Sequence, residues 1–215
     1  HLLTGYVGSL SFLEAILDVL TSLRTHNPNL IYVCDPVLGD HGKLYVPETL
    51  VECYKTSVVP HATVLTPNQF ECELLTGISI KTRADAVQAT NILHKCGVTT
   101  IIITSLEYVT STTANQDSNM LTVFASHVTT PEKQETEDKE VHSIQPEIQP
   151  EIQPERYELN VPKLEGRFSG TGDLSAALLL AWLHRSPGNI SSAVEKTMGT
   201  LQAVLERTIS DGVSI

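Results

Sequence analysis

Short, unbroken apolar runs alternate with amphipathic segments along the first half of the chain, and this alternation constrains the fold more than any other feature. The runs are rich in β-branched residues, which indicates buried strands at 30–34, 63–65 and 99–104. The intervening periodicity predicts helices over 11–26, 47–58, 68–77 and 82–97. Strands without polar alternation are buried on both faces, so we expect a mostly parallel sheet covered by helices on both sides.

Local signals set the ends of these helices. Ser11 and Glu14 have the spacing of a capping box, and Asn68 and Glu71 repeat it. The first helix should end at Asn27, which precedes a proline. We also read the first four residues as the end of a strand that leads directly into a loop.

The second half of the chain contains one segment of different composition. A strand is expected over 121–125, antiparallel to its neighbour, and helices should begin at Asp173 and near Ile190. Between them, residues 131–155 are rich in Glu, Gln and Pro and contain the tandem Ile-Gln-Pro-Glu repeat. Such a segment cannot build a core, so we expect a single domain over 1–215 with a disordered acidic insertion.

Composition excludes several classes of function. The formal net charge is −11 and there is no basic stripe, which argues against nucleic-acid binding. No apolar run reaches the roughly 18 residues that a membrane span needs. Four cysteines are widely spaced, without a C-x-x-C pair, so neither a zinc site nor a disulfide framework is expected. We therefore predict a reducing, cytoplasmic setting.

Polar residues follow three of the predicted strands, and ligands bind beyond the carboxyl ends of such strands. Asp35, Thr66 and Thr104 occupy these positions. The string Gly170-Thr171-Gly172-Asp173 opens a helix expected at the same edge. Its amide groups and helix dipole would hold a phosphate, with the Asp173 carboxylate as a general base. On these four residues alone, a tight loop that merely caps a helix stays equally open.

Several strings together resemble the vitamin B6 kinase branch of the ribokinase-like superfamily. They are Asp-Pro-Val-Leu-Gly-Asp from Asp35, Tyr-Val-Pro-Glu from Tyr45, Thr-Pro-Asn-Gln-Phe-Glu from Thr66, and Gly-Thr-Gly-Asp from Gly170. The resemblance implies a three-layer α/β/α sandwich that lacks its N-terminal βα units. It also implies pyridoxal kinase activity: ATP-dependent phosphorylation of the 5′-hydroxymethyl group of pyridoxal, pyridoxine or pyridoxamine.

The resemblance places the chemical step at Gly170-Thr171-Gly172-Asp173. Asp173 matches the catalytic base, which takes the proton of the attacking 5′-hydroxyl, while Gly170, Thr171 and Gly172 match the anion hole around the transferred phosphoryl group. Thr171 is also expected to contact the nucleotide. Gly170 and Asp173 are expected to contact the substrate, whose ring should lie near Tyr6.

The same resemblance implies further binding residues. Asp35, Asp40 and Glu71 match carboxylates near Mg²⁺, or another divalent cation such as Zn²⁺. Thr66 and Thr104 match positions around a monovalent cation, K⁺ or Na⁺. The nucleotide should contact Asp35, Asn68, Thr104, Ser105, Val161 and Leu164, the last two near adenine.

Two alternatives to an active pyridoxal kinase stay open. The first is a catalytically silent truncated isoform or fragment, because the units that hold the vitamin ring in the family precede the segment matched by His1. The second is a related hydroxymethylpyrimidine kinase. The resemblance further implies a homodimer in the full-length parent, with ATP and a B6 vitamer as its small-molecule partners.

Overall fold

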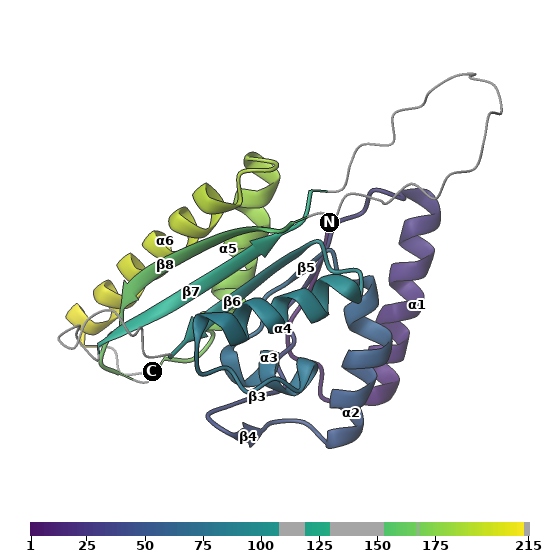
Figure 1. The fold of residues 1–215 in the computed structure, drawn as a ribbon, viewed down its shortest axis with the longest axis horizontal. Coiled ribbons are helices and arrows are strands. Elements are labelled where there is room, and N and C mark those ends of the chain that lie inside the picture. Colours follow the sequence, from purple (N-terminus) through teal and green to yellow (C-terminus); the bar gives the residue numbers. More distant parts are fainter. Residues whose placement is uncertain (108–118, 130–152, 167, 213–215) are drawn as a thin grey trace.

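The computed structural model describes residues 1–107, 119–129, 153–166 and 168–212 (Figure 1). A six-stranded sheet crosses the molecule in the order β1-β2-β5-β6-β7-β8. Its strands are β1 Leu2–Thr4, β2 Tyr32–Cys34, β5 Val64–Leu65, β6 Thr100–Leu106, β7 Met120–His127 and β8 Glu155–Pro162. The first four are parallel, whereas β7 is antiparallel to both β6 and β8. The mostly parallel sheet and its antiparallel addition confirm the prediction.

Helices cover both faces of this sheet (Figure 1). One face carries α1 Leu10–His26, α2 Glu48–Cys53, α3 Gln69–Thr76 and α4 Arg83–Lys95. The other carries α5 Thr171–Arg185 and α6 Ile190–Ser210. After α2 the chain continues through one π-helical turn and one 3₁₀ turn to His61. A two-stranded hairpin, β3 Gly39–Asp40 and β4 Lys43–Leu44, lies beside α3.

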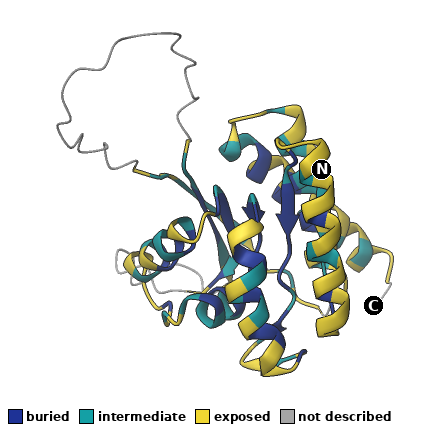
Figure 2. Ribbon diagram, turned by 90° about the vertical axis from the view of Figure 1, so that its right-hand side faces the viewer, coloured by how far each residue is buried: buried dark blue, intermediate teal, exposed yellow. Residues whose placement is uncertain are grey.

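The core is divided by the sheet, because successive strand residues point to opposite faces. Val33, Val64 and Ile102 pack against α5 and α6. Their neighbours in the strands pack beneath α1 to α4: Tyr32, Cys34, Leu65, Ile101 and Ile103. All of these residues are buried. In Figure 2 the strands at the centre of the molecule are dark blue, the colour of buried residues. Burial on both faces explains why the strand sequences are continuously apolar, and it confirms the predicted α/β/α layers.

Two helices begin where the sequence predicts, and one does not. Capping boxes form at Asn68 with Glu71 and at Thr82 with Asp85. The predicted box at Ser11 is wrong, because Ser9 is the N-cap of α1 and accepts from the amide of Phe12. The helix therefore begins two residues earlier than predicted, at Leu10.

One expectation falls largely outside the described residues. Most of the predicted insertion, 130–152, lies there, and its last predicted residue, Glu155, begins β8. Within the described part of the chain, no helix is both long and apolar enough to cross a membrane.

Candidate functional site

The carboxyl ends of the parallel strands lie at one edge of the sheet and are joined by backbone hydrogen bonds. The amide of Asp35, after β2, donates to the carbonyl of Thr4 in β1 at 2.9 Å. The amide of Thr66, after β5, donates to the carbonyl of Cys34 at 3.1 Å. Thr104 in β6 donates its amide to Pro67 at 2.9 Å. The three polar positions that the sequence placed after strands therefore do share one edge.

The first turn of α5 reaches this edge from the other face of the sheet. Gly170 is its N-cap, with φ of 78°, a left-handed conformation that favours glycine. The amides of the first turn of a helix have no intrahelical acceptor, and Gly170 has no side chain with which to cap them. The turn therefore presents free N–H donors and the positive end of the helix dipole, as a phosphate site requires.

Two carboxylates meet at this turn. A Cβ placed on Gly172 would lie 3.3 Å from Oδ2 of Asp35, and one placed on Gly5 would lie 3.0 Å from Oδ1 of Asp173. The Asp173 side chain is therefore held between the start of α5 and the end of β1, above Asp35. Gly5 was not among the predicted site residues, because nothing in the local sequence shows that β1 ends beside α5.

Asp35 has the environment of a cation ligand. It is 5% exposed, and its Oδ1 accepts from the hydroxyl of Thr66 at 3.2 Å. Its Oδ2 has no hydrogen-bond partner among the described residues. Burial raises the pKa of Asp35 to about 6, the Thr66 hydroxyl opposes this rise, and the charge of Asp173 adds to it. A buried, unpartnered carboxylate oxygen beside a second carboxylate fits a divalent cation.

The residues at this edge of the sheet do not supply a full set of metal ligands. Among the residues that the structure describes, no three His, Cys, Asp or Glu side chains gather as metal ligands. This agrees with Mg²⁺, which binds through one or two carboxylates and otherwise keeps water and phosphate oxygens as ligands. The donor set fits an ion that arrives together with a phosphate ligand.

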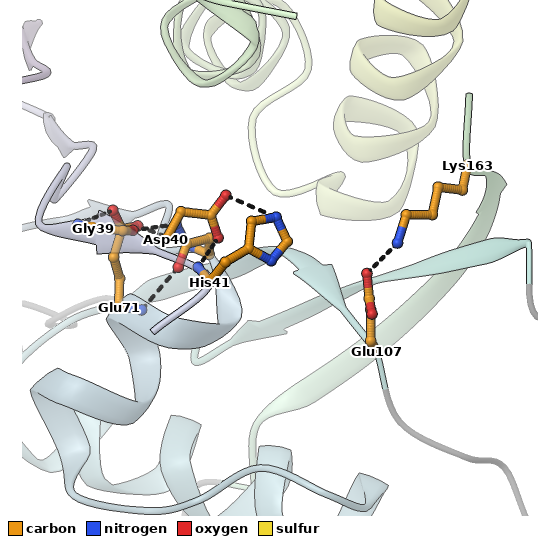
Figure 3. A network of polar contacts seen from close by, with 7 residues as sticks. Gly39, Asp40, His41, Glu71, Glu107 and Lys163 are labelled. Atoms are coloured by element: carbon orange, nitrogen blue, oxygen red, sulfur yellow. Dashed lines mark hydrogen bonds and ion pairs between the residues drawn. The ribbon is translucent and has the colours of Figure 1, made fainter. Parts of the chain in front are cut away.

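Glu71 and Asn68 connect α3 to the β3–β4 hairpin. Figure 3 shows Glu71 of α3 beside Gly39 and Asp40 of the hairpin. Glu71 is 3% exposed and accepts from the amides of Asn68 and Leu38, at 2.8 and 3.0 Å. Burial raises its pKa to about 8, although these N–H donors oppose the rise. The Asn68 side chain accepts from the Glu71 amide and donates to the carbonyl of Gly39, both at 2.8 Å.

The other predicted site residues differ in how exposed their side chains are. Asp40 stands in the hairpin with 43% of its side chain exposed, beside His41. Tyr6 is 58% exposed just beyond β1. Thr104 and Ser105 are half-buried in β6. Val161 belongs to β8 and packs against the core beneath α5 and α6, and Leu164 follows that strand.

An apolar pocket of about 90 Å³ opens beside Gly170. Its walls come from the start of α5 and from the last turns of α6: Phe168, Ser169, Gly170, Thr171, Leu174, Leu201, Val204, Leu205 and Thr208. Sequence reasoning did not identify it, because the pocket depends on how α6 packs against α5. Val204, which lines the pocket, is one of the exposed apolar side chains of α6.

Comparison with known proteins finds pyridoxal kinases among the relatives of this chain. The chain is 43% identical to a pyridoxal kinase of Arabidopsis thaliana, over 98% of this chain and 59% of that protein. It is 41% identical to the human pyridoxal kinase, over 97% and 62%. The structure of Leishmania donovani pyridoxal kinase with ADP and pyridoxamine matches with a TM-score of 0.79 at 32% identity, over 99% of this chain and 63% of that one.

The chain thus spans about three fifths of the length of these relatives. The family described as phosphomethylpyrimidine kinase matches residues 3–143, which is more than half of the chain. The matched segment includes β1, the Asp35 strand, the hairpin and α3, and so carries most of the site edge described above. The chain belongs to the phosphomethylpyrimidine kinase family, and the pyridoxal kinases are its relatives.

Proposed function

We propose that the chain carries the phosphoryl-transfer site of a pyridoxal kinase, which phosphorylates the 5′-hydroxymethyl group of B6 vitamers with ATP. The observation that carries the proposal is the Asp173 carboxylate at the uncapped first turn of α5, above the buried Asp35. A base beside free N–H donors suits the transfer of a phosphoryl group to an alcohol. The named relatives support the choice of vitamin.

Each part of the edge has a role in this reaction. Asp173 would accept the proton of the attacking hydroxyl, and the amides of Gly170, Thr171 and Gly172 would face the charge on the transferred group. Asp35 would hold Mg²⁺, which neutralises phosphate charge when bound, with Asp40 close to the phosphates. We propose Thr66 and Thr104 as neighbours of a monovalent cation, since their hydroxyls lie at the same edge.

The base of the nucleotide would occupy the apolar pocket beside Gly170. A purine needs an apolar slot within reach of its phosphates, and this pocket adjoins the first turn of α5. The ADP complex of the Leishmania relative supports a nucleotide as the ligand. We therefore place the base nearer to α6 than the predicted position at Val161 and Leu164.

We also propose that the whole protein is a cytoplasmic homodimer. The four cysteines, Cys34, Cys53, Cys72 and Cys96, are all free thiols, which supports a reducing compartment. The apolar side chains exposed along α1, Phe12, Val19 and Leu23, support burial of that helix against further protein.

A transfer assay with matched acceptors tests the proposed function. The protein, in the longest form that its gene encodes, is incubated with Mg²⁺ and ATP together with pyridoxal, pyridoxine, pyridoxamine or hydroxymethylpyrimidine. We expect phosphorylated vitamers, identified by mass spectrometry, and at least about tenfold lower kcat/KM for the pyrimidine. Preference for the pyrimidine would favour the activity for which the matched family is named. ATP binding without transfer to any acceptor would instead favour a catalytically silent protein.

Gly5 should matter to this reaction through its lack of a side chain. In Gly5→Ala, the new methyl group would crowd Oδ1 of Asp173 at 3.0 Å and turn the carboxylate away from the acceptor hydroxyl. We expect kcat to fall about tenfold, because small misplacements of a catalytic group are costly, while nucleotide affinity changes little. Gly199→Ala, at a helical position with open space around it, is the control. An unchanged kcat in Gly5→Ala would show that Asp173 is not held by this contact.

A further inference from the structure

The β3–β4 hairpin is fixed to the N-terminus of α3 by three kinds of contact. One carboxylate oxygen of Glu71 accepts from the amides of Leu38 and Gly39, at 3.0 and 3.5 Å. The Asn68 side chain donates to the carbonyl of Gly39 at 2.8 Å. A Cβ on Gly39 would lie 2.8 Å from the ring of Phe70, so backbone and helix are in direct contact. The hairpin therefore has no freedom to move without breaking these contacts.

The hairpin turn itself is also fixed. Asp40 pairs with Lys43 across a two-residue turn, and both turn residues, His41 and Gly42, have positive φ of 47° and 75°. Such turns match the twist of the two strands and allow little variation. Asp40 is the hairpin's acidic side chain, and within the turn it faces His41 (Figure 3). The position of its backbone follows from the contacts of the hairpin with α3.

We propose that Glu71 is a positioning residue, which acts through the hairpin backbone to aim Asp40 at the metal-bound phosphates of the nucleotide. This inference rests on the proposed kinase function and assigns Glu71 a role other than that of metal ligand. The two carboxylates differ in what they face. Both oxygens of Glu71 accept from backbone amides inside the protein. The Asp40 side chain is 43% exposed, and its contacts are with the neighbouring His41: Oδ1 accepts from the His41 amide at 2.8 Å, and Oδ2 lies 3.5 Å from Nε2 of the exposed ring.

Glu71→Gln separates the two functions of this side chain. The glutamine oxygen can still accept from the Asn68 amide, because glutamine also completes a capping box, so α3 should keep its N-terminus. The NH₂ group of the glutamine then faces the N–H groups of Leu38 and Gly39. Because NH₂ is itself a donor, it cannot accept these two hydrogen bonds as the Glu71 carboxylate oxygen does. The substitution thus loosens the hairpin and leaves the helix cap in place.

Hydrogen–deuterium exchange tests the contact without any assay of function. We expect the amides of Leu38 and Gly39 to exchange about tenfold faster in Glu71→Gln than in the wild type, because they lose a charged acceptor. Glu52→Gln, on the exposed side of α2, is the matched control and should change nothing. Unchanged exchange at Leu38 and Gly39 would overturn the proposal, whether or not the protein is a kinase.

A double-mutant cycle tests whether Glu71 acts through Asp40. Glu71→Gln and Asp40→Asn should each raise the Kd for Mg²⁺-ADP about tenfold, measured by calorimetry. The Kd of the double variant should stay within about twofold of the higher of the two single-variant values. In the transfer assay the loss should appear in KM for ATP and not in KM for the vitamer. Losses that multiply in the double variant would overturn positioning and favour direct ligation by Glu71.

A second variant covers the case in which Glu71→Gln does not fold. Asn68→Ser keeps a good N-cap oxygen for the Glu71 amide but removes the donor to the carbonyl of Gly39. It should also raise amide exchange across the hairpin, measured as above. Exchange at Leu38 and Gly39 that stays at the wild-type rate in Asn68→Ser would count against the proposal. Because Asn68 is itself a predicted nucleotide contact, affinity is not the readout for this variant. Failure of the wild type to bind Mg²⁺-ADP would overturn both this role and the proposed function, whereas binding without vitamer transfer would overturn the proposed function alone.

Discussion

Asp173→Asn is expected to lower kcat for vitamer phosphorylation by about a thousandfold, within the range that general-base catalysis contributes. Asparagine has nearly the same shape as aspartate but cannot accept a proton. The Asp173 side chain is exposed at the first turn of α5, so its replacement leaves no cavity and no buried polar group without a partner. The free energy of unfolding should therefore change by no more than about 0.5 kcal/mol.

Asp173→Asn is expected to lower kcat while the affinity for Mg²⁺-ADP stays nearly unchanged. The amides of Gly170, Thr171 and Gly172 remain in Asp173→Asn, so Mg²⁺-ADP should bind within a few-fold of the wild-type affinity, measured by calorimetry. Asp18→Asn, on the exposed side of α1, is the matched control and should keep full kcat. Turnover of Asp173→Asn within tenfold of the wild type would remove Asp173 from the role of base.

Much of the fold could be predicted from the sequence, because the relevant signals are local. Continuous apolar strands such as 99–104 indicated a sheet covered on both faces, and the strands alternate between two cores as expected. The Asn68–Glu71 capping box was also predicted, since its members lie three residues apart. Even the start of α1 was wrong by only two residues, because Ser9 and Ser11 are both competent caps.

The sequence indicates which residues lie at the site, but not which of them are in contact. Asp35, Thr66 and Thr104 follow strands, so their common edge was expected from topology. The contact of Glu71 with Leu38 spans 33 residues, and no spacing rule reveals it. The same holds for Gly5 beside Asp173 and for the pocket between α5 and α6, since both depend on how elements far apart in sequence pack.

Asp35→Asn is expected to stabilise the protein at pH 8 while it abolishes phosphoryl transfer. Burial and the charge of Asp173 raise the Asp35 pKa from 3.8 to about 6, so the folded state disfavours the ionised carboxylate. A shift of about two pKa units corresponds to roughly 2 to 3 kcal/mol. Asparagine carries no charge, and its carbonyl oxygen can still accept from the Thr66 hydroxyl. The variant avoids the cost of a buried charge and loses the proposed metal ligand.

The pH dependence follows from the direction of this shift. Below about pH 4, Asp35 is protonated in both folded and unfolded chains, so the wild type pays no penalty. Between about pH 4 and pH 6 the unfolded chain ionises Asp35 while the folded protein keeps it protonated, so the free energy of unfolding falls. Above about pH 6 both states are ionised, and the fall levels off. The stability difference between Asp35→Asn and the wild type should therefore grow between pH 4 and pH 7 and then stay constant. Taking this difference cancels the part of the Glu71 contribution that comes from burial; the charge of Asp35 is a smaller cause of the raised Glu71 pKa, and that part is removed in Asp35→Asn.

Urea unfolding at several pH values, with and without Mg²⁺ and ADP, measures this difference. With the ligands present, a cation beside Asp35 offsets the buried charge, so the wild type should gain stability and Asp35→Asn should gain much less. Asp18→Asn again serves as the exposed control. A variant less stable than the wild type at pH 8, or a difference that does not vary with pH, would contradict the assignment. The buried charge of Asp35 lowers the stability of the free protein. Binding of the cation and the nucleotide offsets this loss, as expected for a carboxylate that is placed for binding and not for stability.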